Sequence, residues 1–157
     1  MTTVEMKVDA LCRLVLGESY AQKESVKEDL IQLMQSPSVF DAEGVVHEHL
    51  NNLGVPCGIL GHQYLVYAIL KIAEDPHAIN DITGKNGLYK SVSNEFGVTA
   101  SQAERSIRHA IETAWRRGDI TTLNRYFGNT IDAEKGKPTN TEFIARLANI
   151  VRLRLNP

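Results

Sequence analysis

The helical spacing of apolar residues is the feature that most restricts the fold of this 157-residue chain. Apolar side chains recur three and four residues apart along most of its length, as at Val4, Val8, Leu11 and Val15. This is the period of an amphipathic helix. No segment alternates apolar and polar residues over the length of a β-strand, with turn residues on either side. The sequence therefore predicts an all-α fold.

A boundary is predicted near Ser36-Pro37, because proline disfavours helix in the residue before it. Residues 1–40 would form a short N-terminal helical extension, with helices at about 3–16 and 23–35, and residues 41–157 would form the main domain. The helices expected in the main domain lie at about 42–53, 62–74, 88–96, 99–117, 120–127 and 141–154, with a short helical turn at 79–83. The predicted architecture is a helical bundle with a short extension.

The segment Leu88 to Thr113 has the pattern of a helix-turn-helix, whose second helix lies in the major groove of DNA. Gly97 can adopt the left-handed backbone of the turn without steric penalty. Thr99 and Gln102 form a Thr-x-x-Gln capping box, which defines the start of the second helix.

The two faces of this second helix differ in chemistry. Its predicted core stripe consists of Ala103, Ile107, Ala110, Ile111 and Ala114. Its opposite face carries Ser101, Arg105, Arg108, His109, Glu112 and Arg116. Arg105 lies nearly opposite the core stripe and near the helix start, where an arginine can bind guanine through two hydrogen bonds. From the residues alone, a solvated outer face and a DNA-reading face explain this pattern about equally well.

Four blocks of sequence carry a resemblance to a known family: VHEHLNNLGVP at 46–56, GHQYL at 61–65, SQAERSIRHAIETAW at 101–115 and KPTNTEFIA at 137–145. In this order they resemble the C-terminal effector domain of the master response regulator of sporulation initiation in endospore-forming bacteria. The resemblance implies a six-helix bundle that binds double-stranded DNA at tandem G-containing promoter boxes. It also implies that Glu104, Arg105, Arg108 and His109 belong to the recognition helix, with Arg105 as the base reader.

The chain departs from the family pattern in two respects. Gln102 stands where the family usually has an arginine near the start of the recognition helix, so affinity or site preference is expected to differ. The 44 residues before the matching region are too few for a receiver domain, and we expect no control by aspartyl phosphorylation. The residues that we expect to contact DNA are Ser101, Gln102, Glu104, Arg105, Arg108, His109, Arg116 and Lys137.

The charge distribution is consistent with a DNA-binding second part of the chain. The net charge is −2, but residues 1–44 hold four basic and eight acidic side chains, whereas 45–157 hold thirteen basic and eleven acidic ones. A polyanion should therefore meet the second part. Lys135, Lys137, Arg146, Arg152 and Arg154 are candidate phosphate contacts, although a solvated surface explains them equally well.

Other classes of site find little support in the sequence. His47, Glu48 and His49 are neighbours on a helix and point apart, so we expect no metal site. No nucleophile elbow, phosphate loop or paired catalytic carboxylate is recognisable, and we expect neither catalysis nor a cofactor. We also expect no membrane segment and a cytoplasmic protein.

Two questions about partners stay open at this point. The chain could instead be a receiver-less interaction module that binds or titrates a regulator or an RNA polymerase sigma factor. The resemblance associates residues 112–131 with sigma factor contacts. For residues 1–40, whose short helices need tertiary packing, we favour a homodimer over packing on the core of the same chain, because two tethered DNA-reading domains gain avidity.

Overall fold

The computed structural model describes residues 6, 10, 28, 31, 39–130 and 136–156. The chain divides into two compact units, Met1–Asp41 and Ala42–Pro157. In the first unit, Met6, Ala10, Glu28 and Ile31 are helical, as are the residues from Val39 onward. The helices expected at 3–16 and 23–35, and the homodimer assigned to this extension, otherwise concern residues outside the described part of the chain.

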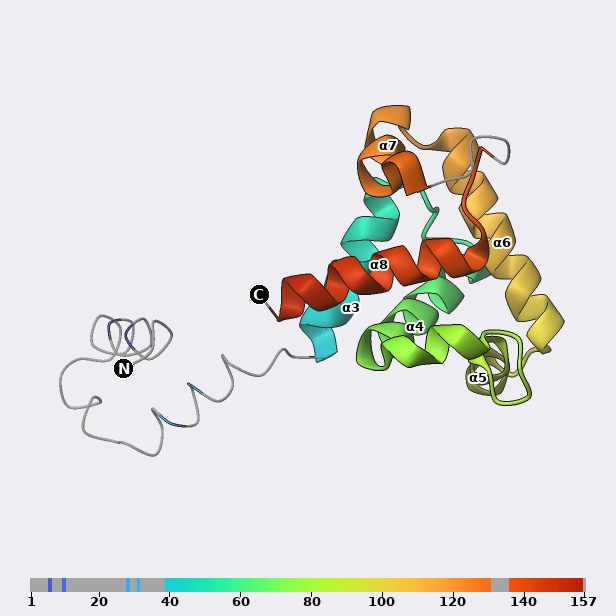
Figure 1. The fold of residues 1–157 in the computed structure, drawn as a ribbon, viewed down its shortest axis with the longest axis horizontal. Helices are drawn as coiled ribbons and strands as arrows, with labels where there is room; N and C mark the ends of the chain where they lie inside the picture. The colour runs from blue at the N-terminus through green and yellow to red at the C-terminus, as the bar shows by residue number, and fades with distance from the viewer. Residues whose placement is uncertain are drawn as a thin grey trace. The chain divides into compact units, whose positions relative to one another are not determined.

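The described residues of the second unit form helices joined by turns and loops and contain no strand, which confirms the predicted all-α class (Figure 1). The α-helices are α3 (Val39–Asn52), α4 (Leu60–Glu74), α5 (Leu88–Phe96), α6 (Ala100–Arg117), α7 (Ile120–Phe127) and α8 (Asn140–Leu155). Two 3-10 helices, η1 (Pro76–Asp81) and η2 (Gly128–Thr130), follow α4 and α7. In the described residues no helix is long and apolar enough to cross a membrane.

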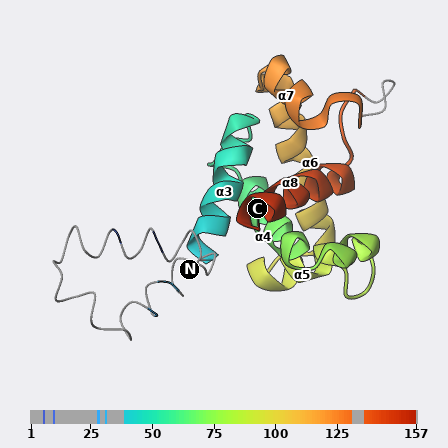
Figure 2. The same ribbon diagram turned by 60° about the vertical axis from the view of Figure 1, so that its left-hand side comes forward.

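Helix α4 lies at the centre of the bundle and packs against both α6 and α8. Figures 1 and 2 show α8 crossing α4 while α6 runs along one side of the bundle. Helix α4 buries a stripe of large and small apolar residues, including Tyr64, Leu65, Ala68, Ile69 and Ile72. This one helix therefore connects the two longest helices of the domain.

The close crossing of α4 and α6 depends on a glycine. A Cβ atom at Gly61 would lie 2.1 Å from the carbonyl oxygen of Ser106 and 2.8 Å from the Cβ of Ala110. Both distances are too short for real Cβ atoms, so a larger residue would push the helices apart. The absence of a side chain at Gly61 thus fixes the depth at which α6 sits on α4.

An aromatic cluster joins the far end of α6 to α7 and α8. The ring of Trp115 meets Phe127 edge-on at a centroid distance of 5.1 Å and Phe143 at 6.3 Å. Phe127 and Phe143 stack at 5.4 Å and are almost completely buried. Trp115 itself is only partly buried, at the edge of the core stripe where the helical spacing places it.

Candidate nucleic-acid interface

Helix α6 begins where its sequence predicts. Gly97 ends α5 with a left-handed backbone, φ 66° and ψ 33°, which a glycine adopts without steric penalty. The hydroxyl of Thr99 accepts a hydrogen bond from the Gln102 amide at 3.1 Å, and the Gln102 side-chain oxygen accepts one from the Thr99 amide at 2.8 Å. The predicted capping box is confirmed, and it engages one end of the Gln102 side chain.

Side-chain contacts also anchor the connection between α5 and α6. The buried Ser93 hydroxyl donates a hydrogen bond to the carbonyl of Val98 at 2.6 Å. The ring of Phe96 packs against Tyr64 and Tyr67 of α4, with centroid distances of 4.8 and 5.8 Å. The turn that leads into α6 is therefore tied both to α5 and to the central helix.

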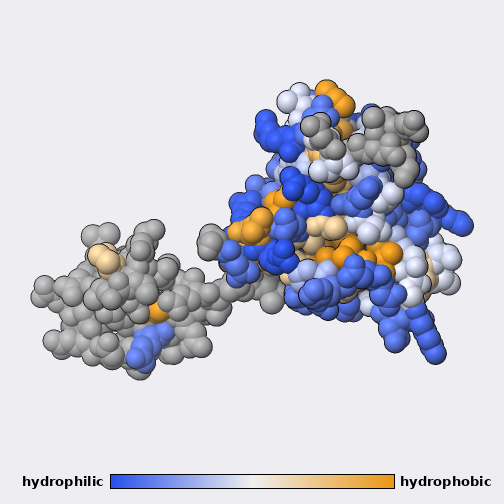
Figure 3. All heavy atoms as spheres, in the orientation of Figure 1, coloured by the Kyte–Doolittle hydropathy of each residue, from blue (hydrophilic) through white to orange (hydrophobic). Residues whose placement is uncertain are grey.

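The buried stripe of α6 is confirmed, since Ala103, Ile107, Ala110, Ile111 and Ala114 are all buried. The exposed face carries Ser101, Gln102, Arg105, Arg108, His109 and Arg116. Figure 3 shows hydrophilic side chains projecting from the side of the bundle that α6 forms. Arg105 takes part in no ion pair with the described residues of the chain.

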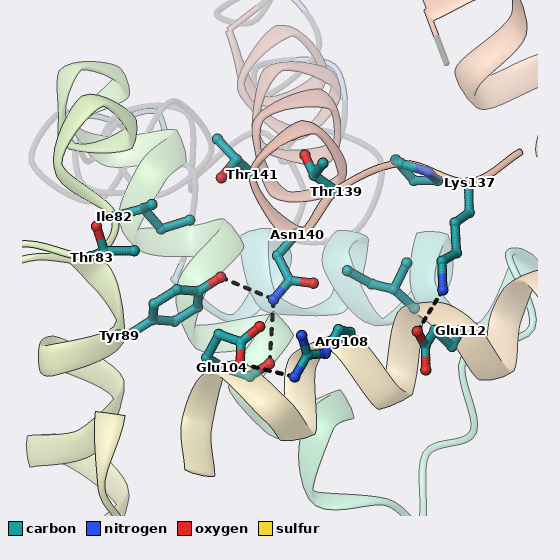
Figure 4. Close-up of a pocket in the computed structure, with 12 residues that line it drawn as sticks. Ile82, Thr83, Tyr89, Glu104, Arg108, Glu112, Lys137, Thr139, Asn140 and Thr141 are labelled. Atoms are coloured by element: carbon teal, nitrogen blue, oxygen red, sulfur yellow. Dashed lines mark hydrogen bonds and ion pairs between the residues drawn. The ribbon is translucent and has the colours of Figure 1, made fainter. Parts of the chain in front are cut away.

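Two ion pairs lie along the flank of α6 (Figure 4). Glu104, which is partly buried, pairs with Arg108 one turn later at 3.3 Å. Glu112 pairs with Lys137, which lies in the segment before α8, at 2.5 Å. The structure therefore brings Lys137 to the same helix as the other predicted contacts, although it is 25 residues from Glu112 in the chain.

Asn140 at the start of α8 connects this flank to α5. Its side-chain nitrogen donates to the Tyr89 hydroxyl at 2.9 Å and to the Glu104 carbonyl at 3.3 Å. Burial raises the pKa of Tyr89, and the hydrogen bond from Asn140 partly offsets this shift. Sequence reasoning did not single out Tyr89 or Asn140, because their contact spans 51 residues and follows no local pattern.

A pocket of about 610 Å³ lies between α6, the start of α8 and the segment after η1. Its walls include the two ion pairs, Tyr89 and Asn140, together with Ile82, Ile111 and Pro138. The hydrogen bond from Lys137 to Glu112 lowers the pKa of this carboxyl group. The pocket is thus bounded on one side by charged groups that point along the flank of α6 (Figure 4).

Three of the five histidines lie away from α6 and support the packing of α3, namely His47, His49 and His62. His62 is isolated in sequence, but it is buried against His47, with Nδ1 of His47 2.9 Å from Nε2 of His62. His49 contacts the Tyr126 hydroxyl at 2.6 Å. Among the described residues, no three His, Cys, Asp or Glu side chains come together as metal ligands would.

Cys57 is an exposed free thiol. Arg146 donates to the carbonyl of Tyr126, Arg152 to the side chain of Asn149, and Arg154 to Glu48. These three arginines therefore all have partners within the bundle. Lys135 lies outside the described residues.

A comparison with protein families identifies the domain. The family model described as sporulation initiation factor Spo0A C terminal matches residues 46–151 of the 157-residue chain. The match begins in α3 and ends in α8, so it includes the whole of α6 and its flank. The chain therefore belongs to the Spo0A C-terminal family, the DNA-binding effector domain of the sporulation initiation factor.

Proposed function

We propose that this chain is a sequence-specific transcription regulator that inserts α6 into the major groove of its target. The observation that carries this proposal is the contrast between the two faces of α6. One face is buried and held at a fixed depth by Gly61, while the other presents Arg105 to solvent near the capped start of the helix. In this arrangement α5 and α6 act as a helix-turn-helix, and α6 is the reading helix.

The predicted contacts have different roles in this proposal. Arg105 reads a guanine through two hydrogen bonds, within tandem G-containing boxes. Ser101, Gln102 and His109 flank it on the exposed face. Arg108, Arg116 and Lys137 neutralise phosphates, and Glu104 orients Arg108 through their ion pair.

The test compares Arg105→Ala with the parent on duplexes that carry tandem family boxes or guanine-substituted boxes. Loss of a bidentate contact should remove about 1–3 kcal/mol of discrimination between the two duplexes. Fluorescence anisotropy titrations at fixed salt measure this difference. If the variant discriminates as well as the parent, Arg105 does not read the base.

Arg108→Ala should have a different effect, because phosphate contacts carry no sequence information. Binding to all duplexes should weaken, and the slope of log affinity against log salt should flatten by about one unit. Arg125→Ala on α7 is a matched control, since Arg125 is exposed but does not lie on α6. An unchanged slope in Arg108→Ala would contradict a phosphate contact.

A second role, contact with an RNA polymerase sigma factor, is favoured by the exposed apolar residue at the start of α7. Ile120 is 67% exposed and lies within residues 112–131, the segment that the family resemblance associates with this contact. Ile120→Ser should weaken capture of sigma factor in a pull-down and leave DNA affinity unchanged. Equal capture by variant and parent would exclude Ile120 from such an interface.

We also propose that residues 1–40 act as a dimerisation extension to the domain at 41–157. Sedimentation of the whole chain and of a truncation starting at Asp41 tests this assignment. A whole chain that stays monomeric well above the concentrations needed for DNA binding would exclude the homodimer.

A further inference from the structure

The ion pair between Glu112 and Lys137 connects the reading helix to the segment before α8. Its side chains are 41% and 45% exposed, respectively, so the pair is open to solvent and to incoming charged groups. Exposed pairs contribute only about 0–1 kcal/mol. A phosphate that is held in one position beside α6 can therefore displace the carboxylate from Lys137 at little cost.

The position of the pair makes such an exchange relevant to DNA binding. Glu112 lies one turn beyond Arg108 on α6, and Lys137 and Arg108 both line the pocket beside this helix (Figure 4). Two cations on this flank are thus held by carboxylates, whereas Arg105 has no acidic partner among the described residues. A duplex that approaches α6 therefore meets Lys137 with its charge already paired, whereas Arg105 and Arg116 are exposed and form no ion pair with the described residues.

Specific and non-specific complexes would use Lys137 differently. In a specific complex, base contacts hold the duplex in one register, so a phosphate can stay beside Lys137 and replace Glu112. In a non-specific complex no register is fixed, and binding depends on phosphate contacts alone. Lys137 then stays with Glu112 and contributes little to affinity.

We propose that Glu112 determines specificity by holding Lys137 in an intramolecular ion pair, which withdraws one cation from non-specific binding to duplex DNA. This inference rests on the proposed DNA-reading role of α6. Glu112 thereby keeps the affinity for duplexes of arbitrary sequence low. Lys137 remains available to the correct site.

The experiment measures the affinity of Glu112→Gln for a random-sequence duplex as a function of salt concentration. Each additional phosphate contact steepens the plot of log affinity against log salt by about 0.9. Glu112→Gln should therefore bind more tightly at low salt, with a slope that is steeper by about 0.9. The slope for a duplex selected from a random pool by the parent should stay the same.

Glu48→Gln is the matched control. Glu48 forms an exposed pair with Arg154 at 3.1 Å, between residues that are distant in sequence, and lies on α3. The Glu48→Gln substitution removes the same negative charge as Glu112→Gln, but at a site that is not part of the α6 flank. If Glu48→Gln steepens the slope as much as Glu112→Gln, the effect belongs to net charge, and the proposal is wrong.

Lys137→Gln in both backgrounds completes the test. In the Glu112→Gln background it should restore the parent slope, whereas in the parent it should leave the slope for random duplex nearly unchanged. If Lys137→Gln alone flattened the salt slope for random duplex by a full unit, the proposal would be overturned, because Lys137 of the parent would already contact phosphate in the non-specific complex. Melting temperatures of all variants confirm that they are folded.

The failure of this inference is distinguishable from the failure of the proposed function. If no preferred sequence emerges from the random pool although the parent binds duplex, sequence-specific reading is wrong, while the salt slopes still decide the role of Glu112. If a preferred sequence emerges and Glu112→Gln behaves as the parent does, only the role of Glu112 is wrong. Absence of duplex binding by every variant at low salt would overturn both.

Discussion

Helices α4 and α6 cross at Gly61, yet the sequence defines them in different ways. Eight of the fifteen residues of α4 are buried, and no side chain caps its start at Ile59. Six of the eighteen residues of α6 are buried, and a capping box fixes its start at Thr99. Packing therefore positions α4, whereas local hydrogen bonds define the start of α6 and leave one of its faces free for binding.

The largest effect should come from a cavity in α4. Leu65 is fully buried, so Leu65→Ala should lower the free energy of unfolding by about 2–5 kcal/mol. Leu60→Ala in the same helix is the control, because Leu60 is 61% exposed and its truncation should change stability by less than about 0.5 kcal/mol. Urea denaturation measures both. Similar losses in the two variants would show that burial does not control the stability of α4.

The next largest effect should come from the crossing point itself. Gly61→Ala places a Cβ against the backbone of α6 and should destabilise the fold by about 1–3 kcal/mol. Gly44→Ala in α3 is the control, since nothing lies within 4 Å of a Cβ there. That change should stabilise the helix by up to about 1 kcal/mol. A neutral Gly61→Ala would mean that α4 and α6 can separate freely.

Loss of the α6 cap should have a smaller effect. Thr99→Ala removes the hydroxyl that accepts from the Gln102 amide, at an expected loss of about 1 kcal/mol. Thr99→Ser keeps the hydroxyl and should retain most of this stability. Thermal denaturation compares the two variants. If alanine and serine behave alike, packing rather than capping determines where α6 begins.

The same contrast explains which parts of the fold were predictable from sequence. The bounds of α5 and α7 match the prediction, because Gly97 and Gly128 end these helices and residue type alone marks such positions. Helix α4 begins at Leu60 rather than at His62, and α3 begins at Val39 rather than at Ala42. No side chain caps the start of α4 at Ile59, so the helical period could locate this start only to within a few residues.

The candidate interface also has features that were predictable from the sequence and features that were not. Helical spacing alone predicted the exposed face of α6 and the position of Arg105 on it. The pair Glu104–Arg108 follows from a four-residue spacing that the sequence also shows. The pair Glu112–Lys137 and the contact of Asn140 with Tyr89 depend on how α8 approaches α6. No periodicity within one helix specifies that approach.

The smallest effect we expect is a dependence of stability on pH that originates from two histidines, one in α3 and one in α4. Burial lowers the pKa of His62, with a further contribution from the neighbouring His47. Burial also lowers the pKa of His49, and Arg154 adds to this shift. In the unfolded chain these histidines regain a pKa of about 6.5. At a pH just below 6.5, His62 and His49 therefore bind protons more readily in unfolded molecules than in folded ones.

The direction of the effect follows from this difference. Above pH 6.5 both states hold neutral histidines and stability is at its full value, whereas below pH 6.5 protonation increasingly favours the unfolded state. The urea concentration at the midpoint of unfolding should decrease as the pH is lowered from 7.5 to 5.5. His62→Asn should make this decrease smaller. His77→Asn is the control, because His77 is exposed in η1 and should leave the slope unchanged. An equal slope in His62→Asn and the parent would show that the contact between α3 and α4 does not depend on the protonation of His62.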